Sequence, residues 1–200
     1  MMKVLGLDVS SSVIGVAIIE GDAKSFKRTY LGHIDLTKDD DIWKKIDHVR
    51  SFLVEKSTTA EFQNLTNIGV EEALLSFRPG ASSATTITML LRMNIVVSFL
   101  AREIFGMTPQ FIPASTARKK CGLKTIMKSK CGIDIKKQVF KIMSDTDLKD
   151  VVWPTKRQSK KQILAKEIPK VQDHCYDECD AYVIARATYL LGCEKQSFIS

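Results

Sequence analysis

The sequence predicts an α/β domain with a five-stranded mixed sheet and helices on both faces. Short apolar runs bounded by glycine, aspartate or proline are typical of buried strands, and longer segments carry apolar residues at helical spacing. Their order is β-β-β-α-β-α-β-α-α. With 200 residues, 44% of them hydrophobic, the chain is long enough for one core and short for two, so we expect a single domain over residues 1–200.

The first part of the chain predicts a meander of three antiparallel strands. Residues 3–9 and 13–19 are apolar runs separated by a serine turn, and Gly21-Asp22 reverses the chain before a third strand over 26–34. Three aspartates at 39–41 offer an N-cap for a helix that starts at residue 42. The later elements are expected at 68–75 (strand), 82–105 (helix), 111–113 (strand), 135–143 (helix) and 176–191 (helix).

Charge is distributed unevenly along the chain. The net charge is +7, but residues 118–170 carry +11 and the remainder carries −4. A basic segment joined to a body with acidic clusters indicates polyanion binding by one part and metal chemistry by the other, although a solvated lysine-rich face is an alternative. Residues 144–172, which are polar and lysine-rich, are expected to be a basic insertion.

No signal-peptide pattern opens the sequence, and the apolar stretches fall short of the ~20 residues needed to span a bilayer. We therefore expect a soluble, intracellular protein with no membrane partner. Five cysteines without Cys-x-x-Cys spacing argue against a disulfide framework. A zinc site is an alternative with poor spacing. Its candidate ligands are Cys121, Cys131, His174, Cys175 and Cys179.

Four carboxylates lie at the ends of apolar runs or head a helix. Asp8 and Glu71 each end a predicted strand, and Asp177 and Asp180 lie one turn apart near the start of the last helix. A carboxylate is costly to bury without a cationic partner, and oxygen ligands suit Mg²⁺. The pattern predicts a site for two Mg²⁺ ions, which can activate a water and stabilise the leaving oxygen of a phosphodiester.

Periodicity separates these acids from their neighbours. Strand alternation puts Glu71 and Glu72 on opposite faces, so only one of them can face the first acid. Asp177 and Asp180 share a helix face, whereas Glu178 lies about 100° away around the helix and is the poorer candidate.

Three segments resemble motifs of the RuvC-type Holliday junction resolvases, the crossover junction endodeoxyribonucleases of the ribonuclease H-like superfamily. Residues 5–17 are similar to the opening motif, in which an Asp ends the first strand and a Gly follows in the second. Residues 70–72 are similar to the second motif, and residues 177–185 resemble the final Asp-x-x-Asp-Ala helix. The resemblance covers most of the chain in order.

This resemblance implies a ribonuclease H-like fold and a magnesium-dependent endonuclease of DNA recombination and repair. Such an enzyme resolves four-way DNA junctions by paired symmetrical nicks, through two-metal-ion hydrolysis. The implied metal ligands are Asp8, Glu71, Asp177 and Asp180. They would hold two Mg²⁺ ions per site, with Mn²⁺ able to substitute, and we expect no nucleotide cofactor. The compartment would be the cytoplasm of a bacterium or of a phage- or virus-infected cell, or an organelle matrix.

The resemblance also implies lysines beside the scissile phosphate. Lys136 and Lys119 are our choices for catalytic lysines, with Lys120, Lys124 and Lys137 as competitors. Phe77 is either a wedge that stacks on an unpaired base or a buried phenylalanine. The full set of expected DNA-binding residues is Phe77, Arg78, Arg118, Lys119, Lys120, Lys124, Lys136 and Lys137.

Family members act as homodimers, which supply two sites at fixed spacing. The helix over 82–105 is the expected interface contributor, and an equally good interpretation makes its apolar stripe part of the core. That stripe consists of Met89, Leu90, Met93, Val97 and Leu100.

Three other functions compete with resolution of DNA junctions. A ribonuclease H-like nuclease acting on structured RNA or an RNA–DNA hybrid would use the same acids, and a non-catalytic protein could bind branched DNA. An actin-like kinase would need two such domains, which this length does not supply. His174 could lie near the metals, while His33 and His48 are interpreted as surface or structural residues.

Overall fold

The structure is a computed structural model that describes residues 1–22, 25–73, 84–159 and 170–197. Its five strands are β1 (Met2–Val9), β2 (Val13–Gly21), β3 (Phe26–Asp35), β4 (Asn67–Glu71) and β5 (Gln110–Ile112). They form one sheet in the order β3-β2-β1-β4-β5. The pairs β1–β2 and β2–β3 are antiparallel, and β1–β4 and β4–β5 are parallel. The predicted five-stranded mixed sheet is confirmed.

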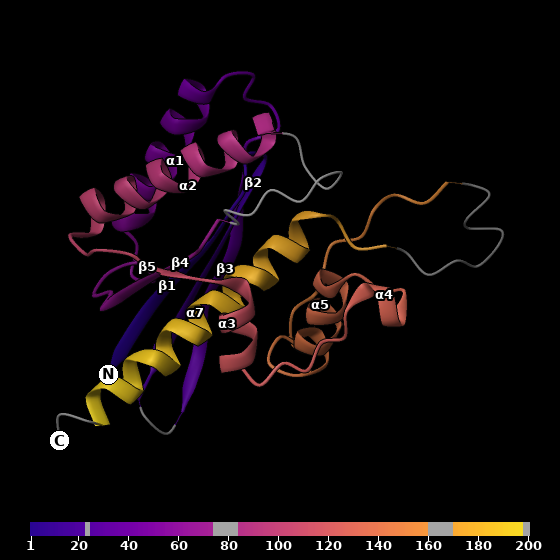
Figure 1. Ribbon diagram of the computed structural model, residues 1–200. Coiled ribbons are helices and arrows are strands. Elements are labelled where there is room, and N and C mark those ends of the chain that lie inside the picture. Colours follow the sequence, from indigo (N-terminus) through magenta and orange to yellow (C-terminus); the bar gives the residue numbers. More distant parts are fainter. Residues whose placement is uncertain (23–24, 74–83, 160–169, 198–200) are drawn as a thin grey trace.

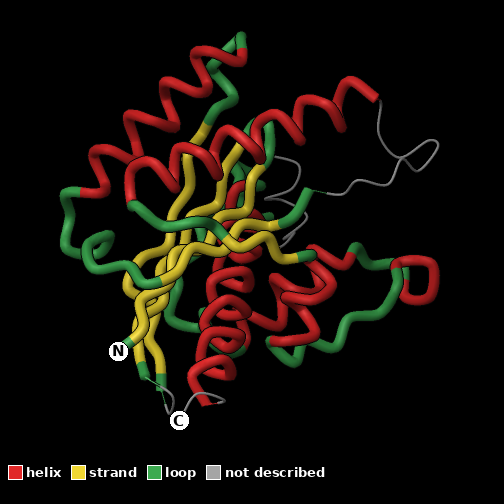
Figure 2. The backbone as a smooth tube through the Cα atoms, turned by 60° about the vertical axis from the view of Figure 1, so that its left-hand side comes forward, coloured by secondary structure: helices red, strands yellow, loops and turns green. Residues whose placement is uncertain are grey.

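Helices cover both faces of this sheet (Figures 1 and 2). The helices are α1 (Ile42–Ser57), α2 (Ala84–Phe105), α3 (Ala114–Lys120), α4 (Lys128–Cys131), α5 (Ile135–Asp145) and α7 (His174–Ser197). The helices α1 and α2 lie on one face, and α7 with α3 and α5 lies on the other. The predicted order was wrong in omitting α3 and α4. These helices have seven and four residues, too short to show an apolar period.

The pleat of β1 assigns its side chains to two separate cores. Leu5 and Leu7 are fully buried in the core under α1 and α2, whereas Val4 is buried in the core under α7. Because successive side chains point to opposite faces, Gly6 and Asp8 share the α7 face with Val4. The strand therefore ends by aiming Asp8 at the helix that carries the other two aspartates.

Glycines on the same face let α7 approach the sheet closely. A Cβ atom at Gly15 would overlap the carbonyl oxygen of Asp177, and one at Gly6 would overlap the backbone of Ala181. Gly15 lies directly opposite Asp8 in the β1–β2 register. The missing side chain thus brings the first turns of α7 against the end of β1.

Much of the apolar stripe of α2 belongs to the core. Met93, Val97 and Leu100 are buried there and Met89 packs against them, so of the two interpretations the structure favours the core for these residues. The residues left exposed are Ile95 at 64% and Phe99 at 60%, one helical turn apart.

Our expectation about membrane-spanning stretches was also wrong for this helix. By length and composition alone α2 could cross a membrane, since its 22 residues include a window of mean hydropathy 1.6. The sequence interpretation discounted it because it contains polar residues. The structure buries 33% of that window inside the protein.

The described beginning of the expected insertion, residues 144–172, packs against α7. Leu148 is fully buried, and the Tyr182 hydroxyl donates to Asp147 Oδ2 at 2.9 Å. Arg186 of α7 pairs with the same carboxylate at 2.9 Å. This beginning of the segment is therefore part of the packed structure.

Candidate active site

Two of the predicted acids come together at the carboxyl ends of neighbouring parallel strands. Leu7 of β1 lies opposite Val70 of β4, so the next residues, Asp8 and Glu71, end the two strands side by side and on the same face. On the other side of Glu71, the buried Asn94 of α2 donates its side-chain N–H to the Glu71 carbonyl oxygen at 2.8 Å.

The first turns of α7 and the start of α5 complete the cluster. Lys136 Nζ donates to Asp177 Oδ1 at 2.6 Å and lies 3.4 Å from Asp180 Oδ2 and 3.8 Å from Asp8 Oδ2. The structure therefore brings Asp8, Asp177 and Asp180 around the lysine that the sequence favoured. With Glu71 they form what we call the acidic cluster.

Burial and mutual repulsion raise the pKa values of these acids. Burial is the largest cause for Asp8, whose pKa lies well above its ordinary value, and the charges of Glu71 and Asp180 add to the rise. Burial also raises the pKa of Glu71 to about 7, again with a contribution from Asp180. The pKa of Asp180 is raised to about 6 by burial, against the opposing charge of Lys136.

Lys136 is the main counter-charge of the acidic cluster. Burial alone would lower the pKa of its ammonium group, but the charges of Asp8, Asp180 and Asp177 outweigh burial and raise that pKa. Four ionised carboxylates and one ammonium carry a net charge of −3, which leaves the cluster short of positive charge.

An all-oxygen donor set with surplus negative charge suits Mg²⁺, so the residues fit this ion. The carboxylates surround Lys136, and no three of them have oxygen atoms all within 4.8 Å of one another. Binding of a cation between them therefore requires Lys136 to move or the acids to draw together.

The second predicted lysine does not join the acidic cluster. Lys119 lies in the last turn of α3 and lines a surface cleft together with Leu190, in the later part of α7. The charge of its neighbour Arg118 does reach the acids, since it contributes to lowering the pKa of both Glu71 and Asp180. Residues adjacent in a helix point about 100° apart, which accounts for the difference.

The remaining DNA-binding candidates make no ion pair with the acidic cluster in the part of the chain that the structure describes. Lys120 pairs with Glu194 of α7. Lys124 and Lys137 are exposed. Phe77 and Arg78 lie outside the described residues.

The sequence analysis did not single out Asn94, and it considered Glu178 only as a poorer ligand for the acidic cluster. A lone asparagine inside an apolar helix is the signal that could have indicated Asn94. Glu178 faces away from the acidic cluster as expected, and its Oε1 lies 2.7 Å from Nδ1 of His33 on β3. His174 stacks on the same imidazole, with ring centroids 3.9 Å apart.

The cysteines do not form the alternative zinc site. All five are free, and Cys121, Cys175 and Cys179 are buried. Within the described ranges, the group of three metal-ligating side chains with close ligand atoms contains no cysteine.

No family model and no curated protein sequence matches the chain. Solved structures do. Thermus thermophilus RuvC matches with a TM-score of 0.59 and 14% identity over 97% of both chains. RuvC of the same organism, in complex with Holliday junction substrate, matches with a TM-score of 0.58 and 14% identity over 98% of this chain and 97% of that one. A complex of the Fowlpox virus resolvase with substrate Holliday junction DNA has a TM-score of 0.46 and 12% identity over 96% and 98%.

The match to RuvC spans nearly the whole of both chains, and its TM-scores of 0.59 and 0.58 indicate a shared fold at low sequence identity. The chain therefore has the ribonuclease H-like fold of the RuvC-type Holliday junction resolvases, as its motifs indicated.

Proposed function

We propose that this chain is a magnesium-dependent endonuclease that resolves four-way DNA junctions by paired symmetrical nicks, in DNA recombination and repair. The observation that carries the proposal is the convergence of Asp8, Asp177 and Asp180 on Lys136 at the end of β1. This cluster lies within a fold shared with a RuvC solved with a Holliday junction. A junction is a substrate with two equivalent strands, so paired nicks require two such sites.

Asp8, Glu71, Asp177 and Asp180 would hold two Mg²⁺ ions, or Mn²⁺ in their place. Two such ions supply Lewis acidity to both the attacking water and the leaving oxygen of the phosphodiester. The four carboxylates would bind and orient these ions, and burial of Asp8, which is 9% exposed, limits competing water.

Lys136 and Arg118 would neutralise the scissile phosphate. Lys136 Nζ already lies among the acids, and its side chain remains 44% exposed, so it can swing toward a phosphate oxygen when cations replace it. Arg118 is the basic residue of α3 whose charge reaches Glu71 and Asp180. Cations placed where charge develops stabilise the transition state.

Exposed cations of the basic segment would bind the DNA arms outside the site. Lys119, Lys124 and Lys137 are exposed on or beside α3 and α5, two helices on the same face of the sheet as α7. Contacts to phosphates give affinity that falls with salt, so we propose that these residues contribute binding and not chemistry. A protein with this substrate would be soluble and would work inside the cell.

We further propose that the chain acts as a homodimer. Ile95 and Phe99 form an exposed apolar pair on α2, away from the acidic cluster on the opposite face of the sheet. A symmetric contact through α2 would leave both active sites open to one junction.

The deciding experiment measures strand cleavage with Mg²⁺ on a labelled four-way junction, a linear duplex and an RNA–DNA hybrid of matching sequence. Wild type, Asp8→Asn and a control variant, Asp145→Asn, are compared. Asp145 is an exposed aspartate that pairs with Lys141 on α5. We expect paired nicks on the junction from wild type and Asp145→Asn, and none from Asp8→Asn.

Other outcomes would replace the proposal. Cleavage confined to the hybrid would assign the acidic cluster to a ribonuclease, and tight junction binding without cleavage would indicate a binding protein. Equal cleavage by Asp8→Asn and wild type would show that the acidic cluster is not the active site.

A further inference from the structure

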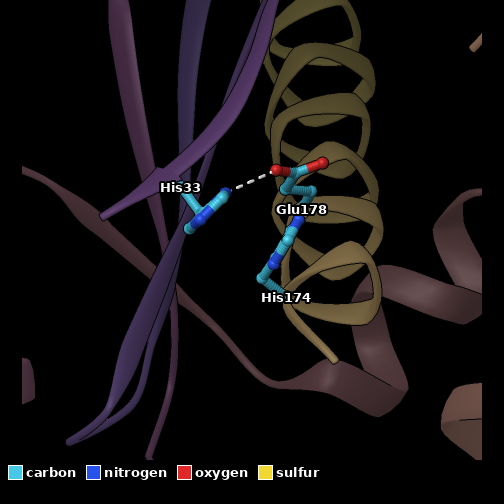
Figure 3. A group of neighbouring side chains, drawn as sticks. All are labelled: His33, His174 and Glu178. Atoms are coloured by element: carbon cyan, nitrogen blue, oxygen red, sulfur yellow. Dashed lines mark hydrogen bonds and ion pairs between the residues drawn. The ribbon is translucent and has the colours of Figure 1, made fainter. Parts of the chain in front are cut away.

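A second group of metal-ligating side chains lies beside the acidic cluster and is distinct from it. His33 comes from β3, and His174 and Glu178 come from the start of α7, four residues apart and therefore on one helix face. Figure 3 shows the three side chains meeting between the strand and the helix. Their ligand atoms all lie within 4.8 Å of one another, and among the described residues this is the group of three metal-ligating side chains that meets this distance.

The contacts inside this group are close. His33 Nδ1 lies 2.7 Å from Glu178 Oε1, and the two imidazole rings stack 3.9 Å apart at 16°. Glu178 has a side chain only 12% exposed, so its carboxylate needs a cationic partner. In the described part of the chain the His174 ring has no hydrogen-bond partner, which leaves a ring nitrogen to bind a ligand.

The donor chemistry separates this group from the acidic cluster. The acids around Lys136 offer only oxygen atoms, the ligands that Mg²⁺ prefers. Two imidazoles and one carboxylate instead suit zinc, which takes nitrogen and oxygen ligands and often leaves a fourth position to water. A single ion shared between the two groups is not required, because they point to different sides of α7.

The three side chains are close enough to close on an ion with a small movement. Tetrahedral zinc holds such ligands at about 2.0–2.2 Å, which puts ligand atoms about 3.4 Å apart. All separations here are within 4.8 Å, so the more distant ligand atoms must approach by up to about 1.4 Å, and the hydrogen bond of 2.7 Å between His33 Nδ1 and Glu178 Oε1 must open as the rings turn. His33 and His174 both line a surface cleft of about 410 Å³, which gives an ion access and room for a water.

We propose that His33, His174 and Glu178 bind one zinc ion that ties β3 to the first turns of α7. This inference goes beyond the proposed nuclease function and does not rest on it. Its structural consequence concerns Asp177, which lies next to Glu178 and packs its carbonyl against Gly15. A metal that holds this turn to the sheet would hold Asp177 in place beside Lys136 without taking part in the chemistry.

The test measures zinc binding by the full chain after a chelator has removed bound metal. Calorimetry gives the affinity and stoichiometry, and the shift in the temperature of thermal unfolding on adding zinc gives an independent readout. The variants are His33→Ala, His174→Ala and Glu178→Gln. The matched control is His48→Ala, because His48 is the third histidine of the chain and pairs with Asp39 on the surface. Asp8→Asn provides a control that disrupts the acidic cluster.

We expect one zinc per chain in wild type, His48→Ala and Asp8→Asn, with the same rise in unfolding temperature in all three. Affinity should fall at least about tenfold in each of the three ligand variants. X-ray absorption of the wild-type zinc complex should show two imidazoles and further nitrogen or oxygen ligands without sulfur, a measurement that does not depend on any variant folding.

Three results would overturn the proposal: no stoichiometric zinc in wild type, sulfur in the zinc coordination shell, or binding lost in Asp8→Asn while His174→Ala keeps it. The last result would assign the zinc to the acidic cluster.

Discussion

At the scale of single residues, burial of Glu71 and Asp180 lowers the stability of the folded, metal-free protein when both carboxylates are ionised. Both are buried near other acids, so both hold protons at pH values where exposed carboxylates have lost them. A pKa raised above its unfolded value means that the folded, metal-free protein binds more protons than the unfolded chain. Stability contributed by these two groups is then present at about pH 4 and is lost as the pH rises through 6 to 7.

Glu71→Gln should therefore stabilise the metal-free protein at pH 8, by an amount on the order of 2 kcal/mol, and have little effect at pH 4. Thermal unfolding of wild type and variant in EDTA across this range measures the difference, and added Mg²⁺ should reverse it by stabilising only wild type. A variant less stable than wild type at pH 8 without metal would show that repulsion does not govern the cluster.

Lys136 and Lys137 offer a second comparison between neighbouring residues. Lys136 contacts three acids, whereas Lys137 is exposed. Lys136→Ala should reduce the cleavage rate at saturating junction by about 10²-fold or more, since it removes a cation beside the reacting phosphate. Lys137→Ala should mainly weaken binding and reduce its dependence on salt. Equal rate losses in both would argue against a distinct role for Lys136.

At the scale of elements, the position of α7 on the sheet decides where its acids point. Gly6, Gly15 and Gly69 on three adjacent strands all meet backbone or side chains of this helix, so the helix lies closer than any side chain would permit. These three glycines therefore set the distance between the end of β1 and the turn of α7 that carries Asp177 and Asp180. Rigid placement of this kind matters because catalytic groups misplaced by about 1 Å lose much of their activity.

Gly15→Ala should displace the first turn of α7, destabilise the protein by about 1–3 kcal/mol and lower cleavage at least tenfold. Urea unfolding and junction cleavage measure the two effects. Gly32→Ala on β3 is the matched control, because its new methyl group would meet the movable ring of Tyr30 and no part of α7. If both variants behave alike, contact between Gly15 and α7 does not position the acids.

At the scale of the whole molecule, the two faces of the sheet carry different kinds of residues. One face carries α7, α3 and α5 with the acidic cluster and the described cations of the basic segment, and the other carries α1 and α2 (Figure 1). On the second face Ile95 and Phe99 are exposed, whereas Met93, Val97 and Leu100 of the same helix are buried. The proposed chemistry and the proposed dimer contact would therefore use opposite faces of the sheet.

Phe99→Glu should convert the proposed dimer to a monomer, because a charge at an apolar contact must be desolvated on association. Light scattering after size exclusion measures the mass, and paired nicking should be lost while single nicks persist. The control is Val54→Glu on α1, where a valine 49% exposed outside α2 should tolerate the charge. A wild type that is monomeric at working concentration would contradict the proposed assembly.

The sequence by itself determined the fold class, the order of the strands along the chain and the elements that carry Asp8, Asp177 and Asp180. These features depend on local periodicity and on capping, as at Asp41, whose carboxylate accepts from the N–H groups of Trp43 and Lys44 at the predicted helix start. Such patterns involve residues only a few positions apart, so the features that depend on them could be predicted without knowing the packing.

Only the tertiary structure decided which basic residues meet the acids and which apolar residues stay exposed. Lys136 contacts the acidic cluster while Lys119 lines a different surface cleft, and Met93 is buried while Phe99 is exposed. Each choice depends on the rotation of a helix about its axis, which is set by contacts with segments distant in the sequence. The meeting of His33 with Glu178, 145 residues apart, has the same cause: no local pattern links a strand near the start of the chain to a helix near its end.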